Sequence, residues 1–242
     1  MGQAVSGAIA GDADLELVGA VDPEHEGEDA SGVTIAARIE SLEAPPPEVV
    51  VDFTQIDAAR ANLRWCAEHG VHAVVGTTGF GDDDIVDLRE RFTSSNCFIA
   101  PNFAIGAVLL MRLAELAAPW FETGEIIELH HDQKIDAPSG TAMLTAERMA
   151  KASSEWGADP TTKEVLEGAR GGEGPAGIRV HSVRLRGLVA HEEVVLGTTG
   201  QSLSIRHDSY DRSSFLPGVL LAVKAVGDRP GVTIGLDALL DL

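Results

Sequence analysis

Residues suited to acid–base chemistry are concentrated in one stretch, residues 128–142, which reads Glu-Leu-His-His-Asp-Gln-Lys-Ile-Asp-Ala-Pro-Ser-Gly-Thr-Ala. Its adjacent histidines, His130 and His131, can donate a proton near neutral pH. Lysine is scarce in this chain, and Lys134 places one of its few full positive charges here; the lysines are Lys134, Lys151, Lys163 and Lys224. Together these residue types predict a site that binds an anion and protonates it.

A turn of small residues, Ser139, Gly140 and Thr141, opens a predicted helix at the end of this stretch. Free amides at a helix N-terminus, with the helix dipole behind them, bind anions. Gly140 lets the backbone approach a ligand, and the two hydroxyls can add hydrogen bonds. We expect no metal at His130 and His131, because neighbours on a strand point to opposite faces and no Cys or Glu-x-x-His spacing completes a zinc site.

The elements that must position this stretch differ between the two halves of the chain. Apolar strand patterns at residues 15–21, 49–53, 71–75 and 97–100 alternate with helical patterns at 57–69 and 82–92. This alternation predicts a Rossmann-like, doubly wound parallel sheet. Ligands bind at the carboxyl ends of such strands. Three of these ends are Asp22, the loop 76–80 and residues 100–103.

After residue 105 the pattern indicates an α+β region with a mixed or antiparallel sheet. Helices are expected at 107–121 and 142–152, and strands at 126–131, 178–186, 192–197 and 202–208, with a Gly-rich loop at 168–177. A last helix at 215–226 and a strand at 232–236 return to the first sheet. We therefore predict one domain of residues 1–103 and 213–242 and a second of residues 104–212.

Charge and cysteine content narrow the function classes. The formal net charge of −20 disfavours nucleic acid and anionic membrane surfaces as partners. No apolar run reaches the roughly 18 residues that cross a bilayer. Two cysteines, Cys66 and Cys97, are too few for a disulfide scaffold. We expect a cytoplasmic protein with a small-molecule substrate.

The stretch 128–142 resembles the signature of dihydrodipicolinate reductases, the 4-hydroxy-tetrahydrodipicolinate reductases of lysine and diaminopimelate synthesis. Further matches follow in order along nearly the whole chain: residues 51–54, 75–80, 100–106, 187–194, 205–209 and 212–215. The resemblance implies hydride transfer from NAD(P)H to a small dicarboxylate that has lost its 4-hydroxyl as water. It also implies a substrate-binding domain that assembles a homotetramer.

The resemblance assigns roles to individual residues. His130 corresponds to the proton donor, and Lys134 to the residue that assists proton transfer and binds substrate. The expected substrate-binding residues are His131, Lys134, Ser139, Gly140 and Thr141. The expected cofactor-binding residues are Gly2, Asp22, Gly76, Thr77, Thr78, Ala100, Pro101, Asn102 and Phe103.

The residues after Asp22 favour NADH over NADPH, although the family includes members that accept both. Residues 23–29 read Pro-Glu-His-Glu-Gly-Glu-Asp, and no Lys or Arg follows until Arg38. A 2′-phosphate would face several carboxylates, whereas NADP-selective sites usually place a cation there.

Two alternatives remain at this stage. One is a related dehydrogenase, such as aspartate-semialdehyde or homoserine dehydrogenase; the first needs a nucleophilic cysteine, and buried inert cysteine is the commoner state. The other is a non-catalytic truncated homologue. Residues 1–5 resemble the end of the family's Gly-x-x-Gly-Arg-Met-Gly turn, so we expect about a dozen upstream residues, with a strand and most of the phosphate loop.

Overall fold

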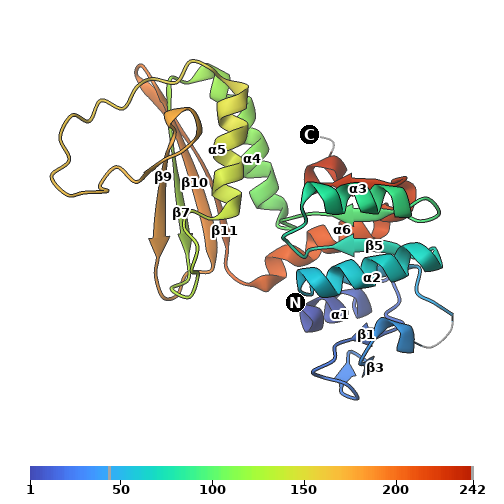
Figure 1. The fold of residues 1–242 in the computed structure, drawn as a ribbon. Coiled ribbons are helices and arrows are strands. Elements are labelled where there is room, and N and C mark those ends of the chain that lie inside the picture. The colour runs from blue at the N-terminus through green and yellow to red at the C-terminus, as the bar shows by residue number, and fades with distance from the viewer. Residues whose placement is uncertain (43–44, 241–242) are drawn as a thin grey trace. The chain divides into compact units, whose positions relative to one another are not determined.

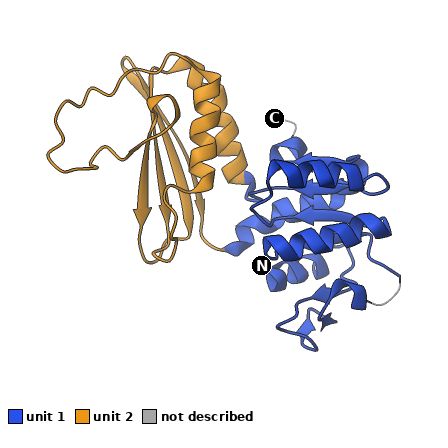
Figure 2. Cartoon of the chain, viewed as in Figure 1, with its two compact units in different colours: residues 1–105, 212–242 blue, residues 106–211 orange. Residues whose placement is uncertain are grey.

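The computed structural model describes residues 1–42 and 45–240, which form two compact units, residues 1–105 with 212–242 and residues 106–211 (Figure 2). The first unit contains a four-stranded sheet in the order β12-β6-β5-β4, with every pair parallel. Its strands are β4 (Val49–Asp52), β5 (His72–Val75), β6 (Cys97–Ile99) and β12 (Val232–Ile234). The last strand pairs with β6, which confirms the predicted return of the chain to this sheet.

Helices cover this sheet because its strands are apolar on both faces. Ala73, Val74 and Val75 of β5 are all fully buried. The crossover helices α2 (Ile56–His69) and α3 (Asp82–Arg91) pack against each other, and α6 (Leu216–Ala225) packs on β5 and on α1 (Gly2–Ala10). Gly70 ends α2 in the left-handed conformation at φ 68°. The doubly wound architecture is confirmed.

The segment before β4 differs from the prediction. Instead of a strand over 15–21, only β1 (Ala20–Val21) is extended and paired, parallel to β3 (Val33–Ala36). The acidic segment that follows Asp22 contains β2 (Asp29–Ala30), which forms a hairpin with β3 through Ser31 and Gly32. Both turn residues have positive φ, 55° and 96°, the conformation that tight hairpins require. A short 3₁₀ turn, η1 (Ile39–Ser41), follows.

The second unit is a five-stranded mixed sheet in the order β11-β10-β7-β9-β8. Its strands are β7 (Thr123–His130), β8 (Gly172–Glu173), β9 (Arg179–Arg184), β10 (Ala190–Thr198) and β11 (Gln201–Ser209). The pair β7–β9 is parallel and the others are antiparallel. Helices α4 (Ile105–Ala117) and α5 (Gly140–Ala152) lie side by side along one face (Figure 1). The α+β class with a mixed sheet is confirmed.

The core of the second unit lies between this sheet and its helices. Ile126, Val194 and Leu196 from the strands and Ala146 and Met149 from α5 are completely buried.

Single 3₁₀ turns connect or extend the main elements of both units: η2 (Ala118–Trp120), η3 (Pro175–Gly177), η4 (Arg212–Phe215), η5 (Val226–Asp228) and η6 (Leu236–Leu239). No helix within residues 1–42 and 45–240 has the length and apolar character needed to span a membrane.

Candidate active site

Strand β7 and helix α5 position the predicted catalytic residues. His130 is the last residue of β7, and the loop 131–139 leads from it to Ser139, the N-cap of α5. The Ser139 hydroxyl accepts a hydrogen bond from the amide of Ala142 at 3.2 Å. The first turn of α5 carries no acidic side chain, and a Cβ on Gly140 would meet nothing within 4 Å. This helix start therefore has the polarity and the space to accept an anion.

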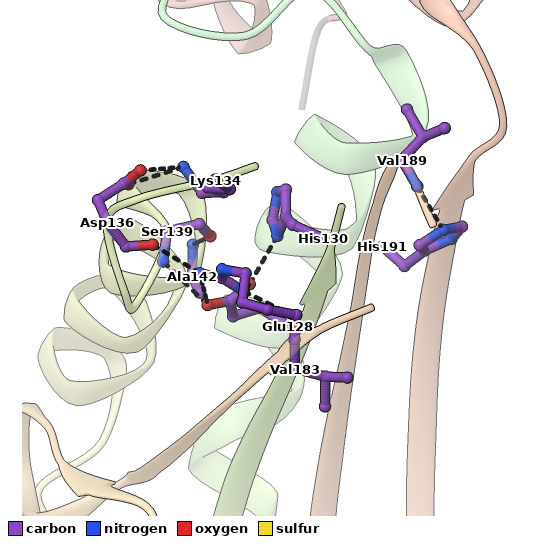
Figure 3. Close-up of polar contacts among 10 residues, drawn as sticks. Glu128, His130, Lys134, Asp136, Ser139, Ala142, Val183, Val189 and His191 are labelled. Carbon is purple, nitrogen blue, oxygen red and sulfur yellow. Dashed lines mark hydrogen bonds and ion pairs between the residues drawn. The ribbon is translucent and has the colours of Figure 1, made fainter. Parts of the chain in front are cut away.

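Glu128 connects these parts, as Figure 3 shows. Its side chain is 0% exposed, and its Oε2 lies 2.6 Å from Nδ1 of His130. Both carboxylate oxygens accept hydrogen bonds from the guanidinium of Arg184, each at 2.8 Å. The amide of Ser139 donates to Oε1 at 3.2 Å. One buried carboxylate therefore holds the histidine, an arginine and the helix start together.

Burial and charge act in opposite directions on this pair. Burial lowers the pKa of His130, and the positive charges of Lys134 and Arg184 lower it further. The hydrogen bond and the negative charge of Glu128 partly oppose these effects. Burial alone would raise the pKa of Glu128, but hydrogen bonds from Arg184, Ser182 and His130 outweigh it, so that pKa is lowered. Glu128 is therefore ionised at neutral pH, and it accepts the Nδ1 proton of His130.

The other predicted substrate-binding residues differ in their surroundings. Lys134 is mostly buried, and its Nζ donates to both carboxylate oxygens of Asp136 at 2.7 Å. His131, one residue beyond the end of β7, is exposed. Lys134, Ser139 and His130 thus gather around one loop, whereas His131 stands at its solvent side. The ammonium of Lys134 therefore has a carboxylate partner within the loop itself.

The predicted nucleotide-binding residues all belong to the first unit, and except for Gly2, at the start of α1, they follow the carboxyl ends of its strands. Asp52, the last residue of β4, is buried and accepts a hydrogen bond from the Thr77 hydroxyl at 2.9 Å. It also accepts bonds from Thr54 at 2.8 Å and from Asn62 at 2.8 Å. The Thr77 side chain therefore fixes the loop after β5, whereas the neighbouring Thr78 is exposed.

Three further members of this set, Asn102, Asp22 and Gly2, lie at two other turns and at a helix start. The Asn102 side chain accepts the amide of Ala104 at 2.8 Å, which shapes the turn after β6. Asp22 follows β1 and caps its own turn by accepting the amide of Glu24 at 2.9 Å. Helix α1 begins at Gly2 with no side-chain cap and no acidic residue in its first turn. Unbonded amides at a helix start suit a pyrophosphate, so the residues present fit a dinucleotide.

Several residues of the site were not identified from the sequence. Glu128 lies inside the stretch 128–142, but the sequence assigned it no role. Arg184 lies 56 residues after Glu128 in the chain. The sequence signal for Arg184 was a cation inside an apolar strand pattern. Glu192 is buried directly opposite Glu128 on β10, and its carboxylate accepts the Thr145 hydroxyl at 2.5 Å. Burial raises the pKa of Glu192 to about 7.

The cysteines do not provide a nucleophile. Cys66 and Cys97 are both buried and free. Burial raises the pKa of Cys66 to about 12 and also raises that of Cys97. A thiol that stays protonated at neutral pH is a poor nucleophile, which removes the chemistry of an aspartate-semialdehyde dehydrogenase.

Comparisons with known proteins give one family along the whole chain. Residues 1–103 match the family model described as the N-terminus of dihydrodipicolinate reductase, and residues 106–240 match the model of its C-terminus. The 4-hydroxy-tetrahydrodipicolinate reductase of Nocardia farcinica is 52% identical over 249 residues, and that of Cutibacterium acnes is 49% identical over 248 residues. Both alignments cover 100% of this chain and 95% of the relative.

A solved structure agrees with the sequence relatives. It is a dipicolinate-bound dihydrodipicolinate reductase from Paenisporosarcina sp. TG-14, with a TM-score of 0.87 and 39% sequence identity. The alignment covers 98% of this chain and 94% of that one. The similarity therefore extends over both units.

Proposed function

Because the chain belongs to the dihydrodipicolinate reductase family, we propose that His130 and Lys134 carry out its reaction. That reaction is the reduction of 4-hydroxy-tetrahydrodipicolinate with a pyridine nucleotide, in lysine and diaminopimelate synthesis. The observation that supports the role of His130 is the 2.6 Å contact between its Nδ1 and the buried Glu128. It leaves Nε2 as the nitrogen that can pass a proton to the substrate.

The substrate carboxylates are bound by the loop 131–139 and the start of α5. Lys134 exchanges its contact with Asp136 for a charge-assisted bond to the substrate. The amides of Gly140 and Thr141 and the hydroxyl of Ser139 donate hydrogen bonds to a carboxylate, with support from the helix dipole. His131, at the solvent side, adds a second donor. Loss of the 4-hydroxyl as water leaves a conjugated imine, and His130 then donates the proton that the ring takes up.

The cofactor binds the first unit through Gly2, Asp22, Gly76, Thr77, Thr78 and residues 100–103. When bound, the reduced nucleotide supplies the hydride. We propose that NADH is preferred, with NADPH accepted more weakly. The turn after Asp22 supports this, because Glu24, Glu26 and Glu28 are exposed there and Glu28 is paired with His25 at 3.2 Å. A 2′-phosphate would meet this negative charge.

The enzyme is also proposed to be cytoplasmic and to form a homotetramer through its second unit. The sheet of that unit has helices on one face (Figure 1), and the apolar side chains of Ile127, Leu129 and Val195 on its other face are only partly buried in the described chain. Covering such a sheet by a second copy buries its apolar side chains. Light scattering behind a sizing column measures the mass and separates tetramer from monomer.

The decisive experiment measures NADH oxidation by the purified protein with freshly generated 4-hydroxy-tetrahydrodipicolinate. Aspartate semialdehyde, tested in parallel, is expected to give no turnover, because no thiol nucleophile is present. A chain that binds NADH yet oxidises it with neither substrate would be a non-catalytic homologue. Comparing kcat/KM for NADH and NADPH at one ionic strength tests the cofactor preference, and equal values would contradict it.

A further inference from the structure

Glu128 has no part in the chemistry proposed above, although it contacts both His130 and Ser139. Its carboxylate is fully buried and bonded to His130, to the guanidinium of Arg184 and to the Ser139 amide. Burying a charge is costly unless all of its lone pairs are used. Hydrogen bonds to three separate groups fix where this carboxylate lies.

We propose that Glu128 is the positioning residue of the active site: its ionised carboxylate holds His130 with the proton on Nδ1 and, at the same time, holds the Ser139 amide. A single group then aligns the proton donor with the anion-binding turn. This inference rests on the proposed role of His130 and extends it to a residue that never touches the substrate.

The charges around the pair determine where the proton lies. Arg184 donates to both oxygens of Glu128 and keeps it ionised, so the Nδ1 proton stays on His130. Lys134, from the loop 131–139, and Arg184, from β9, both disfavour a positive charge on His130. Glu192 faces Glu128 from β10. Glu128 is thus the group that favours the protonated imidazole against burial and two cations.

The same carboxylate links the histidine to the substrate turn through two paths. The direct path is the Ser139 amide on Oε1. The second runs through Arg184, whose Nη2 also donates to the carbonyl oxygen of Asp136 at 2.7 Å. Asp136 in turn holds Lys134. Displacing Glu128 would therefore loosen the loop 131–139 as well as the imidazole.

Glu128→Gln tests this, because the amide keeps the shape and removes the charge. Loss of an adjacent opposite charge should lower the pKa of His130 by about one to two units. Turnover needs protonated His130, so the pH at which kcat falls should move down by the same amount. At pH 7 kcat should drop roughly 10- to 100-fold. KM should change less than about threefold, because the Gln oxygen can still accept the Ser139 amide.

A matched control lies on the same strand. Glu125 also bonds a histidine and an arginine, His181 at 2.8 Å and Arg170, but away from the loop 131–139. Glu125→Gln should leave the pH profile of kcat unchanged. An unshifted profile in Glu128→Gln, or equal shifts in both variants, would overturn the inference.

Nitrogen-15 NMR of the unaltered chain gives a readout that needs no activity. Neutral His130 should carry its proton on Nδ1, and finding it on Nε2 would overturn the inference even if Glu128→Gln failed to fold. Titration of dipicolinate, as a dicarboxylate probe, follows the substrate turn separately. A chain with the expected tautomer but no reductase activity would refute the proposed function and leave the positioning role intact.

Discussion

Strand β7 carries two ion-pair clusters built from the same residue types. Each joins a glutamate to a histidine and an arginine: Glu125 to His181 and Arg170, and Glu128 to His130 and Arg184. In both, the residue on β9 lies two positions beyond the glutamate's register partner, which is Arg179 for Glu125 and Ser182 for Glu128. The two clusters therefore repeat one diagonal arrangement along the parallel β7–β9 pair.

Their surroundings differ because positions 125 and 128 point to opposite faces of the sheet. Glu128 is 0% exposed beneath α5, whereas the Glu125 side chain is 36% exposed on the face without helices. Arg170, which pairs with Glu125, also bonds Asp159 and ties down the long segment that follows α5. The same three residue types thus fasten a loop on one face and hold the proposed proton donor, His130, on the other.

The largest expected effect separates the two histidines. His130→Gln should lower kcat by about 100-fold or more, the usual contribution of a general acid, with little change in substrate affinity. His181→Gln should leave kcat within about twofold, because its partners do not contact the loop 131–139. Steady-state kinetics on both variants measures the difference. Near-normal turnover in His130→Gln would assign the proton to another donor, such as a bound water.

Next in size is the effect of the cation beside His130. Lys134→Ala should lower kcat/KM roughly 10- to 100-fold, since it removes a charge-assisted bond to a dicarboxylate. Both kcat and KM should change, unlike in Glu128→Gln. Lys151→Ala is the matched control, because this exposed lysine ends α5 far along the helix from its N-cap. If Lys134→Ala changed KM alone, its role would be binding only.

Contacts between residues close together in the sequence could be predicted, whereas contacts between distant segments could not. His130, Lys134 and Ser139 lie within ten residues, so their proximity followed from a strand, a loop and a helix start. The parallel strands were likewise evident as apolar runs. Arg184 was not predicted, because its pairing with Glu128 depends on the register of strands separated by α5 and a long segment.

Two other features of the first unit differ from the prediction for the same reason. Asp52 is bonded to Thr77, 25 residues away, only because β4 and β5 end at the same edge. The strand expected at 15–21 is confined to Ala20 and Val21, because only these residues find partners on β3. An alternating apolar pattern predicts an extended segment, but its pairing depends on a neighbour that the local sequence does not specify.

A third prediction concerns stability on the buried face. Glu192 keeps its proton in the folded chain up to pH about 7, but when unfolded it ionises near 4.5, its ordinary pKa. Its raised pKa therefore costs stability as the pH rises from about 4.5 to 7, and the cost stays constant above that. Glu192→Gln should gain roughly 2–3 kcal/mol relative to the native chain between pH 5 and pH 8.

Denaturant unfolding at the two pH values measures this gain. Glu193→Gln serves as the control. The carboxylate of Glu193, the next residue along β10, is only half-buried and is paired with Arg206 at 3.0 Å. The same stability difference at pH 5 and pH 8 would mean that Glu192 is not protonated in the folded chain. The like charge of Glu128 directly opposite makes ionisation of Glu192 unfavourable.

The smallest effect belongs to the exposed cluster. Arg170→Gln removes the bonds to Glu125 and Asp159, but solvent screens partly exposed ion pairs and leaves them little effect on stability. We expect a small loss of unfolding free energy that shrinks at high salt, and no change in kcat. Arg184→Gln should instead lower kcat, because it leaves the buried Glu128 without its cation. Equal kcat values for Arg170→Gln and Arg184→Gln would show that burial does not distinguish the two clusters. The proposed functional difference between them would then be wrong.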